Sequence, residues 1–253
     1  MSSNYRAIII GATSGIGLEV ARHLAQQGVT LGVAGRRLER LEELVAEYGS
    51  EHIKAEKMDV CSEDATEALD RLVAKVGAPD LLLYASGIGK QNPTLDERIE
   101  CDTVMTNSLG MVRIVDHFLN YIKREPKYNS THKAHIAVIT SVAGTRGMGS
   151  APAYSATKSM QSAYLVALSQ HVRMEHIPAS FSDIRPGFVA TDILNPDKHY
   201  PMLISRERAA RHILRGLKHR RRIITFDWKF RLITLVWRLI PRCVWERMTF
   251  VRN

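Results

Sequence analysis

The sequence predicts an α/β protein built on a doubly wound parallel sheet of about seven strands, with helices on both faces and an amphipathic helical extension at the C-terminus. Two patterns lead to this fold. Short apolar runs alternate with longer segments of helical periodicity, which favours right-handed crossovers between parallel strands. The apolar runs also end in turns rich in glycine, serine or aspartate. We therefore expect one domain over residues 1–226 and a basic extension over 227–253.

The composition is that of a globular protein, because 45% of the 253 residues are hydrophobic and 24% are charged. Cys61, Cys101 and Cys243 are far apart in the sequence, which argues against a disulfide framework and a zinc site, and we expect no metal. The apolar run 7–10 is too short for a signal peptide or a membrane span. A cytoplasmic location is expected.

The expected strands and helices follow each other along the chain. Strands are expected at 7–10, 31–34, 53–58, 81–85, 134–140, 181–184 and 222–226. Helices are expected at 18–25, 38–48, 62–76 with Ser62 as N-cap, 97–121, from before 154 to about 175, and 205–218. Ligands of such sheets bind beyond the carboxyl ends of the strands. The polar and glycine residues that follow the strands are therefore expected at one edge.

The first strand leads into a glycine-rich turn and then a helix. The turn contains Gly11, Thr13, Ser14, Gly15, Ile16 and Gly17. Glycines let backbone N–H groups approach an anion at the positive end of a helix, so this order predicts a phosphate site of the Rossmann type. A tight turn without a ligand is the alternative interpretation.

The second expected strand ends in Gly35-Arg36-Arg37. In a dinucleotide fold an acid at this place binds the ribose 2′-hydroxyl of NAD, whereas arginine accommodates the 2′-phosphate of NADP. The sequence has no acid here, so NADP is preferred over NAD, with Arg36 as the main contact and Arg37 in support. The alternative is that both arginines simply begin a solvated helix.

Tyr154 and Lys158 lie four residues apart, so a helix would place them on one face. A nearby ammonium group lowers the pKa of a phenol, whose hydroxyl can then act as an acid or a base. Two unconnected surface residues would show the same spacing. The interpretation as a proton-transfer pair therefore depends on the rest of the chain.

Several motifs occur in a fixed order. They are Gly11, Gly15 and Gly17; Asp59-Val60; Asn107-Ser108-Leu109-Gly110; Ser141, thirteen residues before Tyr154; Tyr154 with Lys158; and Pro186-Gly187 followed by Thr191. In this order the sequence resembles the short-chain dehydrogenase/reductase family from residue 7 to about residue 192.

The resemblance implies a tetrad of Asn107, Ser141, Tyr154 and Lys158. Tyr154 would transfer the proton to or from the substrate oxygen, and Ser141 would hydrogen-bond that oxygen. Lys158 would lower the pKa of Tyr154 and hold the nicotinamide ribose, and Asn107 would hold a relay water. The expected NADP contacts are Gly11, Thr13, Ser14, Gly15, Ile16, Gly17, Arg36, Arg37, Asp59, Val60, Ser86, Gly87, Tyr154, Lys158, Pro186, Gly187, Val189 and Thr191. The family also implies a homodimer or homotetramer.

Two departures from the family pattern are visible. Tyr84-Ala85-Ser86-Gly87 stands where the family commonly has Asn-Asn-Ala-Gly, so bracing by asparagine between neighbouring strands is lost. Ser14 stands where many NADP-preferring members carry a basic residue. The preference for NADP therefore depends on Arg36.

The C-terminal extension is strongly basic. The whole chain has a net charge of +9, whereas residues 203–253 carry 14 lysines and arginines against three acids. A helix there would place Phe230, Ile233, Val236, Trp237 and Ile240 on one face and Arg231, Arg238 and Arg242 opposite, with a break at Pro241. This pattern suits a membrane-surface helix, a lid over the substrate pocket, or a subunit contact. Nucleic-acid binding is not expected, because no recognition module accompanies the charge.

The expected function is reversible hydride transfer between NADP and a carbonyl or secondary alcohol, with reduction of a hydrophobic ketone as the main direction. The apolar residues Phe188, Ile193, Leu194, Met202 and Leu203 of the expected substrate loop favour such a substrate. A non-catalytic NADP-binding or scaffold protein at a membrane surface is the alternative, although all four tetrad residues are present. Another reaction on the same fold, such as epimerisation or dehydration, is the second alternative.

Overall fold

The computed structural model describes residues 4–194, 200–226 and 228–249. Within them, seven parallel strands form one sheet in the order β3-β2-β1-β4-β5-β6-β7. The strands are β1 (Arg6–Ile10), β2 (Thr30–Gly35), β3 (Ile53–Lys57), β4 (Leu81–Tyr84), β5 (Ala134–Ile139), β6 (Ala179–Arg185) and β7 (Ile223–Thr225). The order reverses between β1 and β4, which confirms the predicted doubly wound sheet and places a ligand crevice at their carboxyl ends.

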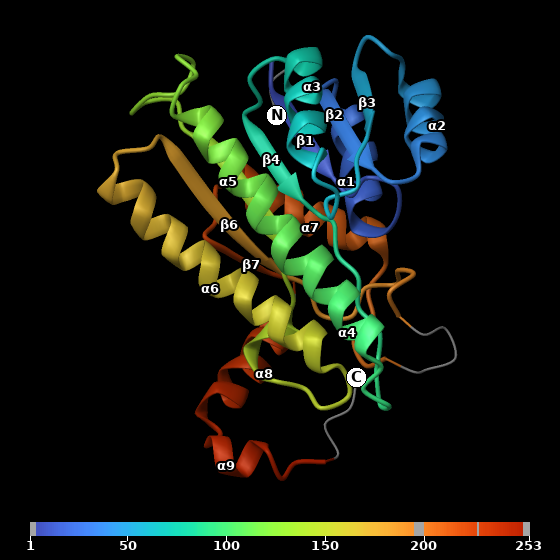
Figure 1. Cartoon of the computed structure of the whole chain (residues 1–253), viewed down its shortest axis with the longest axis vertical. Coiled ribbons are helices and arrows are strands. Elements are labelled where there is room, and N and C mark those ends of the chain that lie inside the picture. The colour runs from blue at the N-terminus through green and yellow to red at the C-terminus, as the bar shows by residue number, and fades with distance from the viewer. Residues whose placement is uncertain (1–3, 195–199, 227, 250–253) are drawn as a thin grey trace.

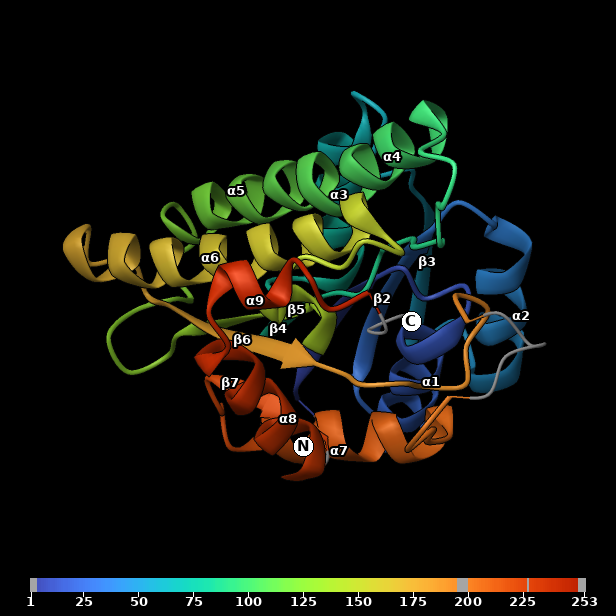
Figure 2. The same cartoon turned by 90° about the horizontal axis from the view of Figure 1, so that it is seen from below.

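Helices cover both faces of the sheet, so the domain has three layers (Figures 1 and 2). One face carries α1 (Gly15–Ala25), α2 (Leu38–Tyr48) and α7 (Arg206–Lys218), and the other carries α3 (Ala65–Val76), α5 (Gly110–Ile122) and α6 (Pro152–Met174). Successive strand residues point to opposite faces, so Ile8 and Ile9 of β1 belong to different cores. Both are fully buried.

The helix expected at 97–121 contains a wider turn in its middle. It comprises α4 (Glu97–Val104), a π-helical turn η1 (Met105–Leu109) and α5. Asn107 lies at the centre of this turn and is fully buried. Such π turns often occur at functional sites, since the extra residue redirects side chains without ending the helix.

The expected N-cap at Ser62 is wrong, because α3 begins at Ala65 with Asp64 as its N-cap. The carboxylate of Asp59 accepts a hydrogen bond from the N–H of Cys61, and its carbonyl accepts one from the N–H of Ser62. These bonds form a turn directly after β3. Ser62 is used in that turn, and the helix starts three residues later.

The C-terminal extension forms α8 (Trp228–Leu239) and the short α9 (Arg242–Trp245), which lie at the lower end of the molecule in Figure 1. Pro241 separates them, as predicted, and is the N-cap of α9. Phe230 is buried, but Val236, expected on the same face, is 48% exposed and therefore lies on another side of α8. No helix of the described segments is long and apolar enough to cross a bilayer.

Part of the predicted substrate loop 188–202 lies outside the described residues, namely 195–199 with Pro196. The same holds for residue 227 at the predicted boundary of the extension and for residues 250–253 at its end.

Candidate active site

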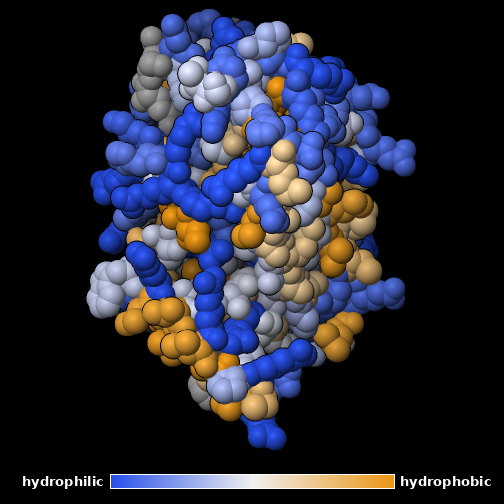
Figure 3. Space-filling model, turned by 90° about the vertical axis from the view of Figure 1, so that its left-hand side faces the viewer, coloured by the Kyte–Doolittle hydropathy of each residue, from blue (hydrophilic) through white to orange (hydrophobic). Residues whose placement is uncertain are grey.

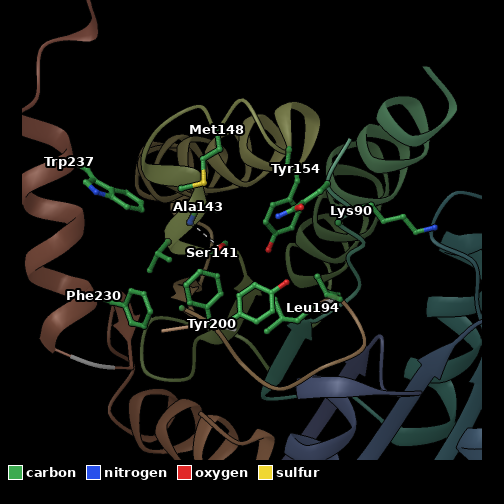
Figure 4. Close-up of a pocket in the computed structure, with 16 residues that line it drawn as sticks. Lys90, Ser141, Ala143, Met148, Tyr154, Leu194, Tyr200, Phe230 and Trp237 are labelled. Atoms are coloured by element: carbon green, nitrogen blue, oxygen red, sulfur yellow. Dashed lines mark hydrogen bonds between the residues drawn. The ribbon is translucent and has the colours of Figure 1, made fainter. Parts of the chain in front are cut away.

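Tyr154 lies in the first turn of α6, which begins with Pro152 at a position where the missing N–H is not needed. Glu100 of α4 accepts a hydrogen bond of 2.7 Å from the N–H of Ala153 and so fixes the start of the helix. The backbone of Gly89 packs so closely on the Tyr154 ring that a Cβ at this position would overlap the ring. The phenol is thereby held with its hydroxyl in a cavity beside Ser141 (Figure 4).

Ser141 follows β5 and is the N-cap of the 3₁₀ turn η2 (Val142–Thr145). Its Oγ accepts a hydrogen bond of 3.0 Å from the N–H of Ala143, which leaves the hydroxyl proton available for a partner in the cavity. Burial raises the pKa of the Tyr154 phenol, and the neighbouring Ser141 hydroxyl offsets this only in part. The phenol is therefore protonated at neutral pH, as a proton donor must be.

Lys158 is 4% exposed, and its Nζ lies 5.8 Å from the centroid of the Tyr154 ring. The Nζ donates hydrogen bonds of 2.9 Å to the carbonyl oxygen of Ile139 and 3.1 Å to Oε1 of Gln161. Burial lowers the pKa of Lys158 to about 7, although the carboxylate of Asp183 acts in the opposite direction.

The direction of the Tyr154 pKa differs from the sequence-based expectation. Lys158 was expected to lower it, yet the phenol pKa is raised, with burial as the largest cause. The reason is that both side chains lie in the same desolvated environment, which disfavours the charged form of each. With its own pKa near 7, Lys158 is only partly protonated at neutral pH and is a weak source of positive charge.

Both polar atoms of the Asn107 side chain form hydrogen bonds within the protein. Its Nδ2 donates 2.8 Å to the carbonyl oxygen of Ile88 and 3.1 Å to Oγ1 of Thr157, and its Oδ1 accepts 2.9 Å from the N–H of Ile88. Its backbone carbonyl accepts a hydrogen bond of 2.7 Å from Nε2 of Gln161. Gln161 therefore connects Lys158 to Asn107 directly. The expected relay water stays a prediction.

Tyr84 replaces part of the bracing that the altered motif after β4 was expected to lose. Its side chain is fully buried, and its hydroxyl donates a hydrogen bond of 2.9 Å to the carbonyl oxygen of Thr106. Thr106 precedes Asn107 in the π-helical turn. The end of β4 is thus fixed to the helix that carries Asn107, although not through an asparagine.

The glycine-rich turn has the shape of a phosphate cradle. A Cβ on Gly17 would overlap the carbonyl oxygen of Gly11, so the start of α1 packs directly on the end of β1. Ser14, the N-cap, makes no side-chain capping hydrogen bond, and the first turn of α1 contains no acid. The first N–H groups of the helix, which have no partners within it, can therefore bind an anion. The residues present fit a dinucleotide diphosphate.

The end of β2 brings Arg36 and Arg37 to the same edge. Both are exposed, and Nη2 of Arg37 donates a hydrogen bond of 3.0 Å to Oγ1 of Thr13 in the glycine-rich turn. Gly35 packs against the methyl group of Thr13. Arg36 and Arg37 thus place positive charge beside the phosphate cradle.

Other predicted cofactor residues gather around the same crevice. Gly11 packs on the backbone of Ser86, and a Cβ on Gly87 would lie 3.3 Å from both Oδ1 of Asn107 and Nζ of Lys158. Thr191 lies beside Gly15, since a Cβ on that glycine would be 3.5 Å from the Thr191 methyl group.

The remaining predicted cofactor residues differ in whether their side chains or only their backbones could contact a cofactor. The carbonyl oxygen of Pro186 accepts a hydrogen bond from the N–H of Val142, which fixes the end of β6 beside η2. Val60 and Val189 are buried in the two cores, so only their backbones could contact a cofactor. Asp59 caps its own turn, as described above. Gly187 packs against the ring of Phe230 from the C-terminal extension.

A largely apolar pocket of about 680 Å³ of empty space, part of it open to solvent, extends from Ser141 and Tyr154. Phe188, Ile193 and Leu194 line it, as expected, whereas Met202 and Leu203 do not. Phe230 and Trp237 of α8 form the wall opposite Tyr154 (Figure 4). Met148 and Tyr200 complete the apolar lining, and the side chain of Lys90 extends away from Tyr154.

Several site residues were not found from the sequence. Gln161 lies three residues after Lys158 and seven after Tyr154, so helical periodicity alone places it on the same face. Phe230 and Trp237 were expected on an apolar face whose contact was left open between a membrane surface, a lid over the pocket and a subunit. Their place in the pocket wall agrees with the lid. In the described part of the chain no cluster of side chains could hold a metal ion.

A parallel sheet with a phosphate cradle at β1, and the half-buried Tyr154 with the buried Lys158 and Ser141 beside it, defines a dinucleotide-dependent oxidoreductase. The family model for short chain dehydrogenase matches residues 5–200. The chain therefore belongs to the short-chain dehydrogenase family, and it is an oxidoreductase that acts on CH–OH groups with a nicotinamide dinucleotide.

Relatives and solved structures agree with this assignment. An uncharacterized oxidoreductase of Myxococcus xanthus is 28% identical and aligns over 96% of each chain. A short chain dehydrogenase/reductase of Burkholderia phymatum in complex with NAD has a TM-score of 0.77 at 20% identity, covering 100% of this chain and 98% of that one. An alcohol dehydrogenase of Thermococcus sibiricus complexed with 5-hydroxy-NADP has a TM-score of 0.71 at 24% identity, covering 87% and 94%. At these identities the two structures show the fold alone.

Proposed function

We propose that the protein reduces a hydrophobic ketone to a secondary alcohol with NADPH. The observation that carries this proposal is the position of the Tyr154 and Ser141 hydroxyls at one end of an apolar pocket. A carbonyl oxygen that accepts hydrogen bonds from both hydroxyls would leave the rest of the substrate among Phe188, Leu194 and Trp237. These apolar side chains can contact the alkyl chain or the ring of a substrate without leaving a polar group unpaired.

The proposed mechanism assigns one task to each side chain. Ser141 donates a hydrogen bond to the ketone oxygen and stabilises the negative charge that grows there. When bound, the nicotinamide cofactor supplies the hydride that adds to the carbonyl carbon. Tyr154 gives its phenolic proton to the oxygen, so that the product is a neutral secondary alcohol. Lys158, held by Gln161 and the Ile139 carbonyl, orients the site, and its Nζ, 5.8 Å from the centre of the Tyr154 ring, can return a proton.

Two features of the β2 end support the preference for NADP over NAD. The two residues directly after β2 are Arg36 and Arg37 and not an acid, and both are exposed beside the glycine-rich turn. A carboxylate would repel a 2′-phosphate, whereas guanidinium groups bind it through charge-assisted hydrogen bonds.

The experiment that tests the proposed function follows NADPH oxidation with short, long-chain and polycyclic ketones, using wild type and Tyr154→Phe. We expect turnover by wild type on the long-chain or polycyclic ketones. Loss of the proton donor should lower kcat by roughly 10²- to 10⁴-fold and leave the affinity for NADPH nearly unchanged. The matched control is Tyr164→Phe on the same helix, since the Tyr164 hydroxyl bonds Asp116, which does not line the pocket.

The two alternatives give different results. Tight NADPH binding without turnover on any carbonyl would favour the non-catalytic binding or scaffold protein. Consumption of a substrate with no net oxidation of NADPH would favour epimerisation or dehydration. Equal activity of wild type and Tyr154→Phe would refute the role of Tyr154.

We further propose a cytoplasmic homo-oligomer, a dimer or a tetramer, that makes peripheral contact with a membrane through the extension. Exposed apolar side chains support the oligomer: Val104, Met105 and Leu109, on α4 and η1, are each at least 40% exposed. Groups of this kind on a helix pair are typical of subunit contacts.

A further inference from the structure

Helix α8 carries a second apolar face that points to solvent. Trp228, Leu232, Leu235 and Leu239 occupy positions i, i+4, i+7 and i+11, which form one stripe along a helix. Their exposed fractions are 70%, 52%, 55% and 75%. Val236 borders the stripe and is 48% exposed. A soluble helix normally buries its apolar stripe, so this face is available for a partner.

The opposite face of α8 is fixed to the domain. Phe230 is buried against Gly187, and Trp237 lines the pocket. Arg146, from the segment after η2, donates hydrogen bonds to the carbonyl oxygens of Trp237, Arg238 and Ile240, at 2.9, 2.9 and 2.6 Å. These contacts satisfy the last carbonyls of the helix. Rotating α8 to bury its outer stripe would break all of them.

Positive charges flank the outer stripe. Lys229 lies on one side of it, and Arg231 and Arg238 lie on the other, as their spacing along the helix requires. Residues 228–249 contain five lysines and arginines and one acid, Glu246, which pairs with Arg242. Figure 3 shows apolar groups next to long hydrophilic side chains on the lower part of this side of the molecule.

We infer that the outer face of α8 binds the surface of an anionic lipid bilayer. An exposed apolar stripe between rows of basic side chains is the arrangement of a helix that lies in the membrane interface. The apolar side chains would enter the boundary between headgroups and acyl chains, and Lys229, Arg231 and Arg238 would contact anionic headgroups. At about 18 Å, the twelve residues of α8 suit a helix lying parallel to the surface.

The charge beside the stripe favours an anionic bilayer, and not a second copy of the chain, as the partner of this face. In a two-fold contact the same patch meets itself, so the basic residues beside each stripe would face those of the other copy. Within residues 228–249 the one acid is Glu246, and it pairs with Arg242. An anionic bilayer accepts the same charges without repulsion.

Docking would place the substrate pocket next to the lipid. Phe230 and Trp237 form a pocket wall on one side of α8, and the outer stripe lies on the other side. One helix diameter, about 10 Å, therefore separates the pocket from the bilayer surface. Delivery of substrate from the bilayer to the pocket would be the role of this docking, and it rests on the proposed hydrophobic substrate. Docking itself is measured without substrate or NADPH.

The test is flotation of the full-length chain with vesicles of phosphatidylcholine alone or mixed with phosphatidylglycerol. We expect wild type to bind the mixed vesicles and to dissociate as salt is raised. Leu232→Ser/Leu235→Ser/Leu239→Ser should lower the partition coefficient by about tenfold or more, because apolar burial is lost. The matched control is Val166→Ser/Met174→Ser on α6, whose side chains are 61% and 66% exposed.

A second variant, Arg231→Gln/Arg238→Gln, removes charge and no packed group. It should weaken binding to the mixed vesicles several-fold and leave the thermal midpoint unchanged, so the inference can be tested even if the leucine variant does not fold. Equal binding by wild type and both variants would overturn the inference, as would absence of wild-type binding. A lower mass of the leucine variant in light scattering would also overturn it, since the stripe would then be a subunit contact. Turnover on a small soluble ketone should be unchanged in both variants.

Discussion

At the scale of single residues, the ammonium group of Lys158 lies in a place that disfavours its charge. It is 4% exposed and depends on one carbonyl and one amide oxygen for hydrogen bonds. Burial lowers its pKa from 10.5 to about 7. Between these two pH values the unfolded chain binds a proton that the folded chain does not, so the stability of the folded chain rises with pH over this range.

Comparison with Lys158→Met should reveal this dependence. Below pH 7 both states of wild type are protonated at Lys158, and the difference in unfolding free energy between the two proteins should be constant. From pH 7 toward 10.5, wild type should gain stability relative to the variant by at most about 1.4 kcal/mol per pH unit. Urea unfolding at several pH values measures this. Lys123→Met, at the exposed end of α5, is the control for the loss of one surface lysine, and a flat difference for Lys158→Met would contradict the prediction.

Arg36 determines the cofactor in our proposal, and its charge can be reversed without touching the core, since the side chain is exposed. Arg36→Asp should weaken NADPH binding by about tenfold or more and favour NADH. The reason is that a carboxylate repels the 2′-phosphate of NADPH but accepts a hydrogen bond from the 2′-hydroxyl of NADH. Titration with both nucleotides measures the ratio of affinities. Arg40→Asp makes the same charge change in the first turn of α2, and an equal effect of both variants would show that only net charge matters.

At the scale of elements, Arg146 joins the segment after η2 to the end of α8. Trp245 adds a second link, because its indole N–H donates a hydrogen bond of 2.7 Å to the carbonyl oxygen of Gly147. Met148 lines the pocket and donates its N–H to Oγ of Ser155, 2.9 Å away. The position of the extension is thus connected through a few residues to the start of the helix that carries Tyr154.

Arg146→Met should loosen this connection. Losing hydrogen bonds to three carbonyls should destabilise the docked extension by roughly 1–3 kcal/mol. The KM for a long-chain ketone should rise severalfold, while kcat for a small ketone should change little, because Trp237 is a pocket wall and not a proton donor. Limited proteolysis of the extension measures the loosening. The control is Arg124→Met, which loses one hydrogen bond to the carbonyl oxygen of Asn120 near the end of α5. It should leave the KM for the long-chain ketone and the rate of proteolysis unchanged.

At the scale of the whole molecule, the sheet and its ligand edge could be predicted because each strand is a short buried run followed by a turn. The glycine-rich turn follows from the same pattern, whereas the tetrad was implied by the resemblance to the family. The links that depend on distant segments could not be predicted. Nothing local shows that Arg146 meets residues 237–240, or that the hydroxyl of Tyr84 reaches Thr106. The raised pKa of Tyr154 was also missed, since spacing shows a neighbouring charge but not the burial of both groups.

The extension contains all three tryptophans of the chain, Trp228, Trp237 and Trp245. They occupy three environments: Trp228 is 70% exposed on the outer stripe of α8, Trp237 lines the pocket, and Trp245 packs edge-on against Trp237 at 5.3 Å between ring centroids. The intrinsic indole emission of the protein therefore arises from these 18 residues alone. It is a built-in optical probe of the extension, so a spectral shift on heating that precedes the loss of far-ultraviolet circular dichroism would record release of the extension before global unfolding.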